Sequence, residues 1–269
     1  MKKIKDTDYL YLSAYLQAKV AHRGDSIPDK AAVYKELSAL APDPRIVDFF
    51  RLKYDYHNAK VYLKSVAAGE DASRLYLPMG RSDPASLTEA FRTEDYRSLP
   101  ADFASALKES SETLGRTYDP RLADFILDKA YVKEMKDTAE KTRSEFLLGY
   151  AALHADALNL RALVRMLKSS VRPEQLKSVL TDCGSVRSTA ITAAYPDAAA
   201  VLGLFKSTAL APSLAEAEKA VRGEGFTPFE RAVRGCLNAY MEKAKYVCFG
   251  ENVLIRYLYQ IEEQAHERI

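Results

Sequence analysis

The chain has 269 residues, 48% of them hydrophobic, so it is long and apolar enough to bury a substantial core. Its 39 basic and 37 acidic residues give a net charge of +2 with no block of like charges, which argues against a nucleic-acid partner. The apolar stretches are much shorter than the roughly 20 residues that cross a bilayer, and the first residues lack a signal-peptide pattern, so we expect a soluble intracellular protein.

Proline positions predict where the helices lie, because proline is disfavoured inside a helix but tolerated in its first turn. Long helices are expected in three proline-free segments, residues 45–77, 121–172 and 229–269. Alternating strand-type runs are scarce, and the predicted fold class is therefore all-α. Helix starts are expected where a side-chain oxygen precedes a proline, at Asp43-Pro44, Asp83-Pro84, Asp119-Pro120 and Thr227-Pro228.

Apolar residues in the first segment recur at alternating spacings of three and four, as in a helix that buries one face. These residues are Phe49, Leu52, Tyr56, Ala59, Leu63 and Val66. The same spacing recurs 101 residues later at Tyr150, Leu153, Ala157, Leu160, Val164 and Leu167. Polar residues repeat in register, with Asp55, Asn58 and Lys60 matched by Asp156, Asn159 and Arg161. The apolar and polar patterns together indicate an internal repeat.

A weaker third copy of the polar pattern is Glu263-x-x-His266-x-Arg268 near the end of the sequence. We therefore predict three quasi-repeated helical bundles, at residues 1–80, 81–180 and 181–269. Gly149 and Gly235 lie inside predicted helices, where we expect them to allow close packing between helices.

The repeated acid and amide are predicted to have a structural role. Asp55 and Asn58 are three residues apart, so on a helix they lie side by side at the flank of the apolar face. There they can hydrogen-bond to a neighbouring helix or its frayed end and fix how the two pack. His57 follows Asp55 by two residues, whereas His154 precedes Asp156 by two, so the imidazole is not part of the repeat.

Catalytic and metal sites are not expected. A di-iron helical bundle needs two Glu-x-x-His pairs, and only Glu263 with His266 has that form. The cysteines, Cys183, Cys236 and Cys248, form no C-x-x-C pair, so a disulfide framework or zinc site is not expected either. Phosphate-binding loops, dinucleotide motifs and nucleophile elbows are missing. We therefore predict no catalytic residue, no metal and no cofactor.

Four further segments carry a recognisable order of motifs: RLKYDYHNAKVYLK at 51–64, DPRLADFILDKAYVKEM at 119–135, ALNLRALVRMLK at 157–168 and PFERAVRGCLNAYMEKAKYVCFGENVLIRYL at 228–258. Their most specific parts are the D-x-H-N-x-K core, the LDKAY element, and Phe-Gly followed by Leu-x-x-Tyr-Leu. Taken in order, these segments resemble the C subunit of the bacterial and archaeal V/A-type ATPases, which is the counterpart of the d subunit of the vacuolar enzyme.

The resemblance implies a funnel of three helical bundles that acts as a non-catalytic part of a rotary machine. In that role the protein lies on the cytoplasmic face of the membrane, on the proteolipid rotor ring, and receives the D and F subunits of the central shaft. It couples ATP hydrolysis or synthesis to transport of protons or sodium ions without forming a self-oligomer.

Two departures from the family pattern leave alternatives open. The first bundle and the C-terminal helix are both expected to be shorter than in the family. A helical adaptor for other soluble proteins, outside any ATPase, is therefore an alternative. A helical-bundle enzyme is a third hypothesis, which rests only on Glu263 and His266.

Overall fold

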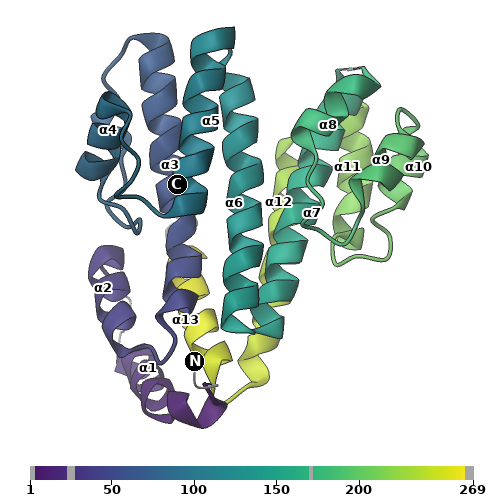
Figure 1. The fold of residues 1–269 in the computed structure, drawn as a ribbon. Helices are drawn as coiled ribbons and strands as arrows, with labels where there is room; N and C mark the ends of the chain where they lie inside the picture. Colours follow the sequence, from purple (N-terminus) through teal and green to yellow (C-terminus); the bar gives the residue numbers. More distant parts are fainter. Residues whose placement is uncertain (1–3, 23–27, 170–171, 264–269) are drawn as a thin grey trace. The chain divides into compact units, whose positions relative to one another are not determined.

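A computed structural model describes residues 4–22, 28–169 and 172–263, and every regular element in those ranges is a helix (Figure 1). The predicted all-α class is confirmed. The α-helices are α1 (Leu10–His22), α2 (Lys30–Leu40), α3 (Pro44–Ala68), α4 (Pro84–Thr93), α5 (Ala101–Thr117), α6 (Pro120–Thr142), α7 (Glu145–Lys168), α8 (Leu176–Val179), α9 (Ser188–Ala194), α10 (Ala198–Gly203), α11 (Leu214–Val221), α12 (Thr227–Met241) and α13 (Glu251–Glu263). Short 3-10 helices are η1 (Asp6–Tyr9), η2 (Ser73–Leu75), η3 (Pro173–Gln175), η4 (Ala211–Ser213) and η5 (Glu242–Tyr246).

The described residues form two compact units. Unit 1 comprises those up to residue 143 and those from residue 243 onward, and unit 2 comprises residues 144–242. The division into bundles at 1–80, 81–180 and 181–269 remains a prediction, as does the funnel arrangement. None of the described helices combines the length and hydropathy needed to span a bilayer.

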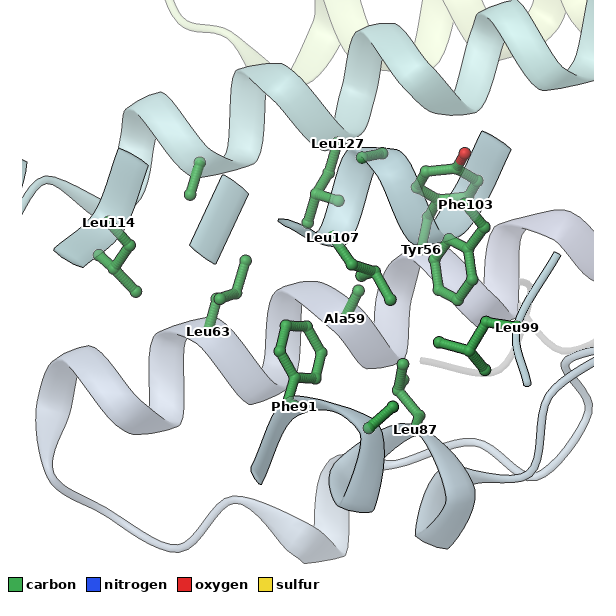
Figure 2. Close-up of a cluster of buried hydrophobic side chains, with 13 residues drawn as sticks. Tyr56, Ala59, Leu63, Leu87, Phe91, Leu99, Phe103, Leu107, Leu114 and Leu127 are labelled. Carbon is green, nitrogen blue, oxygen red and sulfur yellow. The ribbon is translucent and has the colours of Figure 1, made fainter. Parts of the chain in front are cut away.

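Unit 1 is built around α3, which packs against α6, α5, α4, α2 and α13 (Figure 1). A cluster of buried apolar side chains joins α3 to α4, α5 and α6 (Figure 2). Tyr56, Ala59 and Leu63 of the predicted apolar face belong to this cluster, and Tyr56 stacks edge-on against Phe103. Val66 is 56% exposed, so the prediction is wrong for this residue, which lies in the last turn of α3.

A helix starts at each of the four predicted places, and three of the four have the predicted cap. Asp43, Asp83 and Asp119 each cap a helix whose first residue is proline, and each carboxylate accepts a hydrogen bond from a backbone N–H two residues on. The fourth helix, α12, begins at Thr227, so Thr227 is its first residue and Phe226 holds the capping position without a side-chain hydrogen bond.

The segment 121–172 contains two long helices rather than one. Arg143 ends α6 in the left-handed region, with φ of 60°, and the hydroxyl of Ser144 caps α7 by accepting from the N–H of Leu147. In unit 2, α7 packs against α11 and α12. The predicted apolar face of α7 is buried from Tyr150 to Val164 and half-buried at Leu167.

The two glycines predicted to allow close packing differ. A Cβ on Gly149 would overlap the hydroxyl of Tyr240, which confirms the prediction there. A Cβ on Gly235 would meet nothing within 4 Å, so the prediction is wrong for this residue, which lies on the exposed side of α12.

Candidate functional site

The repeated polar residues occupy equivalent places on the central helices of the two units. Asp55 and Asn58 lie on α3, and Asp156 and Asn159 lie on α7. All four are at most 2% exposed. Because buried polar groups are costly unless hydrogen-bonded, the partners of these side chains determine what the repeat does.

Each asparagine pairs with the backbone of one loop residue. The amide nitrogen of Asn58 donates to the carbonyl of Leu77 (2.9 Å), and its oxygen accepts from the N–H of Leu77 (2.9 Å). Asn159 makes the same two bonds with Thr181, at 2.8 and 2.9 Å. An asparagine side chain carries both an acceptor and a donor, so it can satisfy both groups of one peptide residue.

Each aspartate holds the same loop a few residues further on. One oxygen of Asp55 accepts from the N–H of Ser82 (3.1 Å), and the other accepts from Nε of Arg81 (2.7 Å). One oxygen of Asp156 accepts from the N–H of Val186 (3.0 Å). The other accepts from the N–H of Ser185 (3.1 Å) and from its hydroxyl.

We call these arrangements anchor 1 (Asp55, Asn58 and loop residues 77–82) and anchor 2 (Asp156, Asn159 and loop residues 181–186). The sequence pattern predicted a neighbouring helix or its end as the partner. The structure instead has the loop that leads into the next helix, α4 in unit 1 and α9 in unit 2. Each anchor thus fastens a connection onto the central helix of its unit, α3 in unit 1 and α7 in unit 2.

Both anchors also need a glycine that the sequence pattern did not reveal. A Cβ on Gly80 would overlap the carboxylate of Asp55, and one on Gly184 would overlap that of Asp156. Each glycine follows the asparagine-bound residue by three positions. The two glycines are 104 residues apart while the aspartates are 101 apart, so a search at one fixed period misses them.

The basic residues of the repeat, Lys60 and Arg161, form ion pairs outside the anchors. Lys60 pairs with Asp128 of α6 (2.5 Å), and Arg161 pairs with Glu230 of α12 (2.7 Å). These four side chains are between 23% and 33% exposed. Both bases therefore link the central helix to another helix of the same unit and lie outside the anchored loops.

Anchor 1 contains an ionic network, whereas the aspartate of anchor 2 is held by neutral donors. Arg81 bridges Asp55 and Glu134 of α6 (2.6 Å to Glu134), and the hydroxyl of Tyr56 donates to Glu134 (2.9 Å). Arg51 donates to the carbonyls of Met79 (3.2 Å) and Gly80.

These neighbours have opposing effects on protonation. Burial raises the pKa of Asp55, while the guanidinium of Arg81 and the hydrogen bond from Ser82 oppose that shift. Burial lowers the pKa of Arg81, but the hydrogen bonds and negative charges of Glu134 and Asp55 have the larger combined effect. The pKa of Arg81 therefore lies above its usual value.

The two histidines near the anchors have different surroundings. Nε2 of His57, an exposed residue, lies 3.0 Å from the carbonyl of Leu75, just before the anchored loop. The ring of His154 lies edge-on to Tyr150, with the centroids 5.3 Å apart.

Glu262 is a second buried acid that the sequence patterns did not reveal. It is 4% exposed and accepts hydrogen bonds from the hydroxyls of Tyr34 and Tyr54, the latter at 2.7 Å to each oxygen. Lys30 (3.0 Å) and Lys53 also pair with it. Burial alone would raise the pKa of Glu262, but Lys53 and the two tyrosines outweigh that effect and lower it.

The suggested third copy of the repeat begins one residue later, at Glu263, and its His266 and Arg268 lie outside the described residues. A usable signal for Glu262 is present in the sequence. It follows the buried Leu258 by four positions, so it falls on the apolar face of α13.

The three buried acids Asp55, Asp156 and Glu262 all hydrogen-bond to other groups of the protein. Both oxygens of Asp55, Asp156 and Glu262 accept hydrogen bonds from the protein itself. Within the described ranges, no three or more His, Cys, Asp or Glu residues are grouped so as to hold a metal ion. The hydrogen bonds of these acids therefore hold loops and helices together, which is a structural role.

Comparison with known proteins relates this chain to one family and to a curated relative. A sequence model of the ATP synthase (C/AC39) subunit family matches residues 30–264, which include both anchors. The C subunit of the V-type sodium ATPase of Enterococcus hirae is 23% identical over 158 residues, or 59% of this chain. That match spans 48% of the relative, about half its length.

Proposed function

This chain belongs to the ATP synthase (C/AC39) subunit family, as its resemblance to the C subunit of the V/A-type ATPases indicated, and we propose that it is a central-stalk subunit of such a rotary enzyme. In this role it receives the D and F subunits of the central shaft and rests on the membrane proteolipid ring. It is a cytoplasmic, peripherally attached and non-catalytic part that couples the shaft to transport of protons or sodium ions.

The observation that carries this proposal is the family match over residues 30–264. The similarity to a subunit of a V-type sodium ATPase supports it as well. Because that alignment covers about half of the relative, the partners and the transported ion are part of the proposal.

The anchors suit a part that transmits torque. Such a part must resist shear, and a loop held to a long helix by buried hydrogen bonds cannot slide without losing them. Asn58 and Asn159 each fix one loop residue through two bonds, and the aspartates add at least two more in each anchor. Two units thus use the same device to hold a connection against their central helix.

Affinity purification from native membranes tests the proposal. The tagged chain is expressed in its own host, the membranes are solubilised in mild detergent, and the captured proteins are identified by mass spectrometry. We expect the shaft subunits and the ring proteolipid in stoichiometric amounts.

A matched pair of baits makes this test specific. Asn159→Ala removes two hydrogen bonds of anchor 2, whereas Arg231→Gln changes an exposed side chain of the same unit. The Arg231→Gln bait should recover the complex like the wild type, and the Asn159→Ala bait should recover less. Capture of soluble proteins without any ATPase subunit would reject the proposal and favour the adaptor alternative.

A further inference from the structure

A pocket of about 370 Å³ lies in unit 1 between α1, the turn at residues 244–248, and α13. It shares no residue with either anchor or with the Glu262 cluster. Its volume falls within the range of small-molecule sites, which are mostly apolar with a few placed polar groups.

The walls of the pocket are largely apolar. Leu16 and Val20 contribute from α1, and Val253 and Tyr257 contribute from α13. Gln17 donates to the carbonyl of Cys248 (2.9 Å), which ties the turn to α1. The pocket is therefore bounded by two helices and a fastened turn.

Among the described residues that line the pocket, the charged ones are both positive, Lys245 and Arg256, and none is an acid. Neither cation has an ion-pair partner in the part of the chain that the structure describes.

This differs from the Glu262 cluster on the same helix. Glu262 is paired with two lysines and two tyrosines, whereas no acid of the described residues pairs with Arg256. A carboxylate bound in the pocket would give Arg256 and Lys245 the anionic partner that the described residues do not supply.

We propose that this pocket binds a monocarboxylate with an apolar body, the chemical class of medium-chain fatty acids. The carboxylate accepts hydrogen bonds from Lys245 and the guanidinium of Arg256, and the hydrocarbon lies against Leu16, Val20 and Val253. Arg–carboxylate pairing is among the stronger charge-assisted interactions. The inference does not depend on the proposed role in an ATPase.

Cys248 provides a direct readout, because it is an exposed free cysteine and it lines the pocket. The rate of its alkylation by iodoacetamide is measured by peptide mass spectrometry on the full chain, with octanoate, octanol or octylamine present. Cys183, in unit 2 and not in the pocket, is the internal control.

We expect octanoate to slow alkylation of Cys248 in a saturable way without affecting Cys183. Octanol should protect about tenfold less well at equal concentration, because it lacks the charge that the two cations would bind. Equal protection by octanol or octylamine, or no protection by octanoate, would overturn the proposal.

Variants test the role of the guanidinium. Arg256→Gln should weaken octanoate binding by about tenfold, Arg256→Lys should retain part of it, and the exposed Arg231→Gln should leave it unchanged. Undiminished protection in Arg256→Gln would refute the assignment. If that variant does not fold, Lys245→Gln is used with the same expectation.

A free acid and an acid held in a membrane share this chemistry, so a second arm separates them. The full chain is sedimented with phosphatidylcholine vesicles, with or without oleic acid. Protection by octanoate without co-sedimentation assigns the site to a free acid, and co-sedimentation only with oleic acid assigns it to a membrane lipid.

Discussion

Anchor 1 and anchor 2 perform the same task with different chemistry. In both, an asparagine binds one loop residue through two bonds, and an aspartate three positions earlier holds the loop beyond a glycine. In anchor 1 the second oxygen of the aspartate is bound by Arg81, which also pairs with Glu134. In anchor 2 the same place is taken by the backbone and hydroxyl of Ser185.

The comparison separates what the device requires from what can vary. The aspartate, asparagine and glycine are common to both anchors, since each meets a backbone geometry that other residue types would not satisfy. The second partner of the aspartate is an arginine in one anchor and a serine in the other. Anchor 1 is therefore expected to depend on charge, and anchor 2 on neutral hydrogen bonds.

Arg81→Met should cause the largest loss of stability. It leaves Asp55 and Glu134, 1% and 6% exposed, without their shared cation, and breaking a buried ion pair costs roughly 3–5 kcal/mol. Urea unfolding measures the loss as a lower midpoint of the transition. Arg97→Met, which alters an exposed ion pair, should leave the midpoint unchanged. A wild-type midpoint for Arg81→Met would contradict the charge dependence of anchor 1.

The loss of stability in Arg81→Met should also depend on pH. Burial raises the pKa of Asp55, and without Arg81 that pKa rises further above its unfolded value. A group whose folded pKa is raised contributes stability at low pH that is lost as pH rises through the folded pKa. The difference from wild type should therefore be smaller at pH 5 than at pH 7.5, and a larger difference at pH 5 would contradict this account.

Asn159→Ala should cost about 2–3 kcal/mol, because it leaves the buried N–H and carbonyl of Thr181 without partners. Asn58→Ala should cost less, since Leu77 is only partly buried and water can replace the amide. Chemical denaturation of both variants gives the order. Full stability in both would show that the repeated amide is not structural.

Gly184→Ala and Gly80→Ala should each cost about 2 kcal/mol, because the new methyl group displaces the aspartate that holds the loop. Gly184→Ala should be the worse of the two, since its Cβ would lie 2.8 Å from the carboxylate carbon of Asp156, against 3.3 Å from that of Asp55 in Gly80→Ala. Gly235→Ala is the matched control. It adds a methyl group to an open site on a helix, so a thermal melt should show equal or slightly higher stability.

Lys60→Met and Arg161→Met should have the smallest effects, below about 1 kcal/mol each, because these ion pairs are partly exposed. Thermal melts at low and high salt measure them. A loss as large as that of Asn159→Ala would mean that the base belongs to the anchor.

Much of the local structure and half of each anchor could be predicted from the sequence. Proline with a preceding aspartate located three helix starts, because both the capping bond and the missing N–H act within a few residues. The repeated Asp and Asn were found because a helix keeps their spacing fixed. The fourth start, at Thr227, was also located, but the helix there begins one residue earlier than expected, so Thr227 is its first residue and not its cap.

The partners of the anchors could not be predicted because they depend on loop path. The segment from Asp156 to Gly184 is three residues longer than the segment from Asp55 to Gly80. The two glycines therefore do not share the 101-residue spacing of the repeat. Arg81 and Glu134 meet only through packing of α3 against α6. Val66 was misjudged because periodicity does not show where a neighbouring helix ends, and Gly235 because its place inside a helix does not show which side of that helix is packed.

In the proposed role, this chain couples a rotary ATPase to ion transport. The most direct measurement is ATP-driven ion uptake by membrane vesicles from a strain that lacks the gene, with ATP hydrolysis followed in parallel. We expect ion uptake to be lost and then restored when the wild-type chain is supplied. Undiminished uptake in the deletion strain would contradict the account.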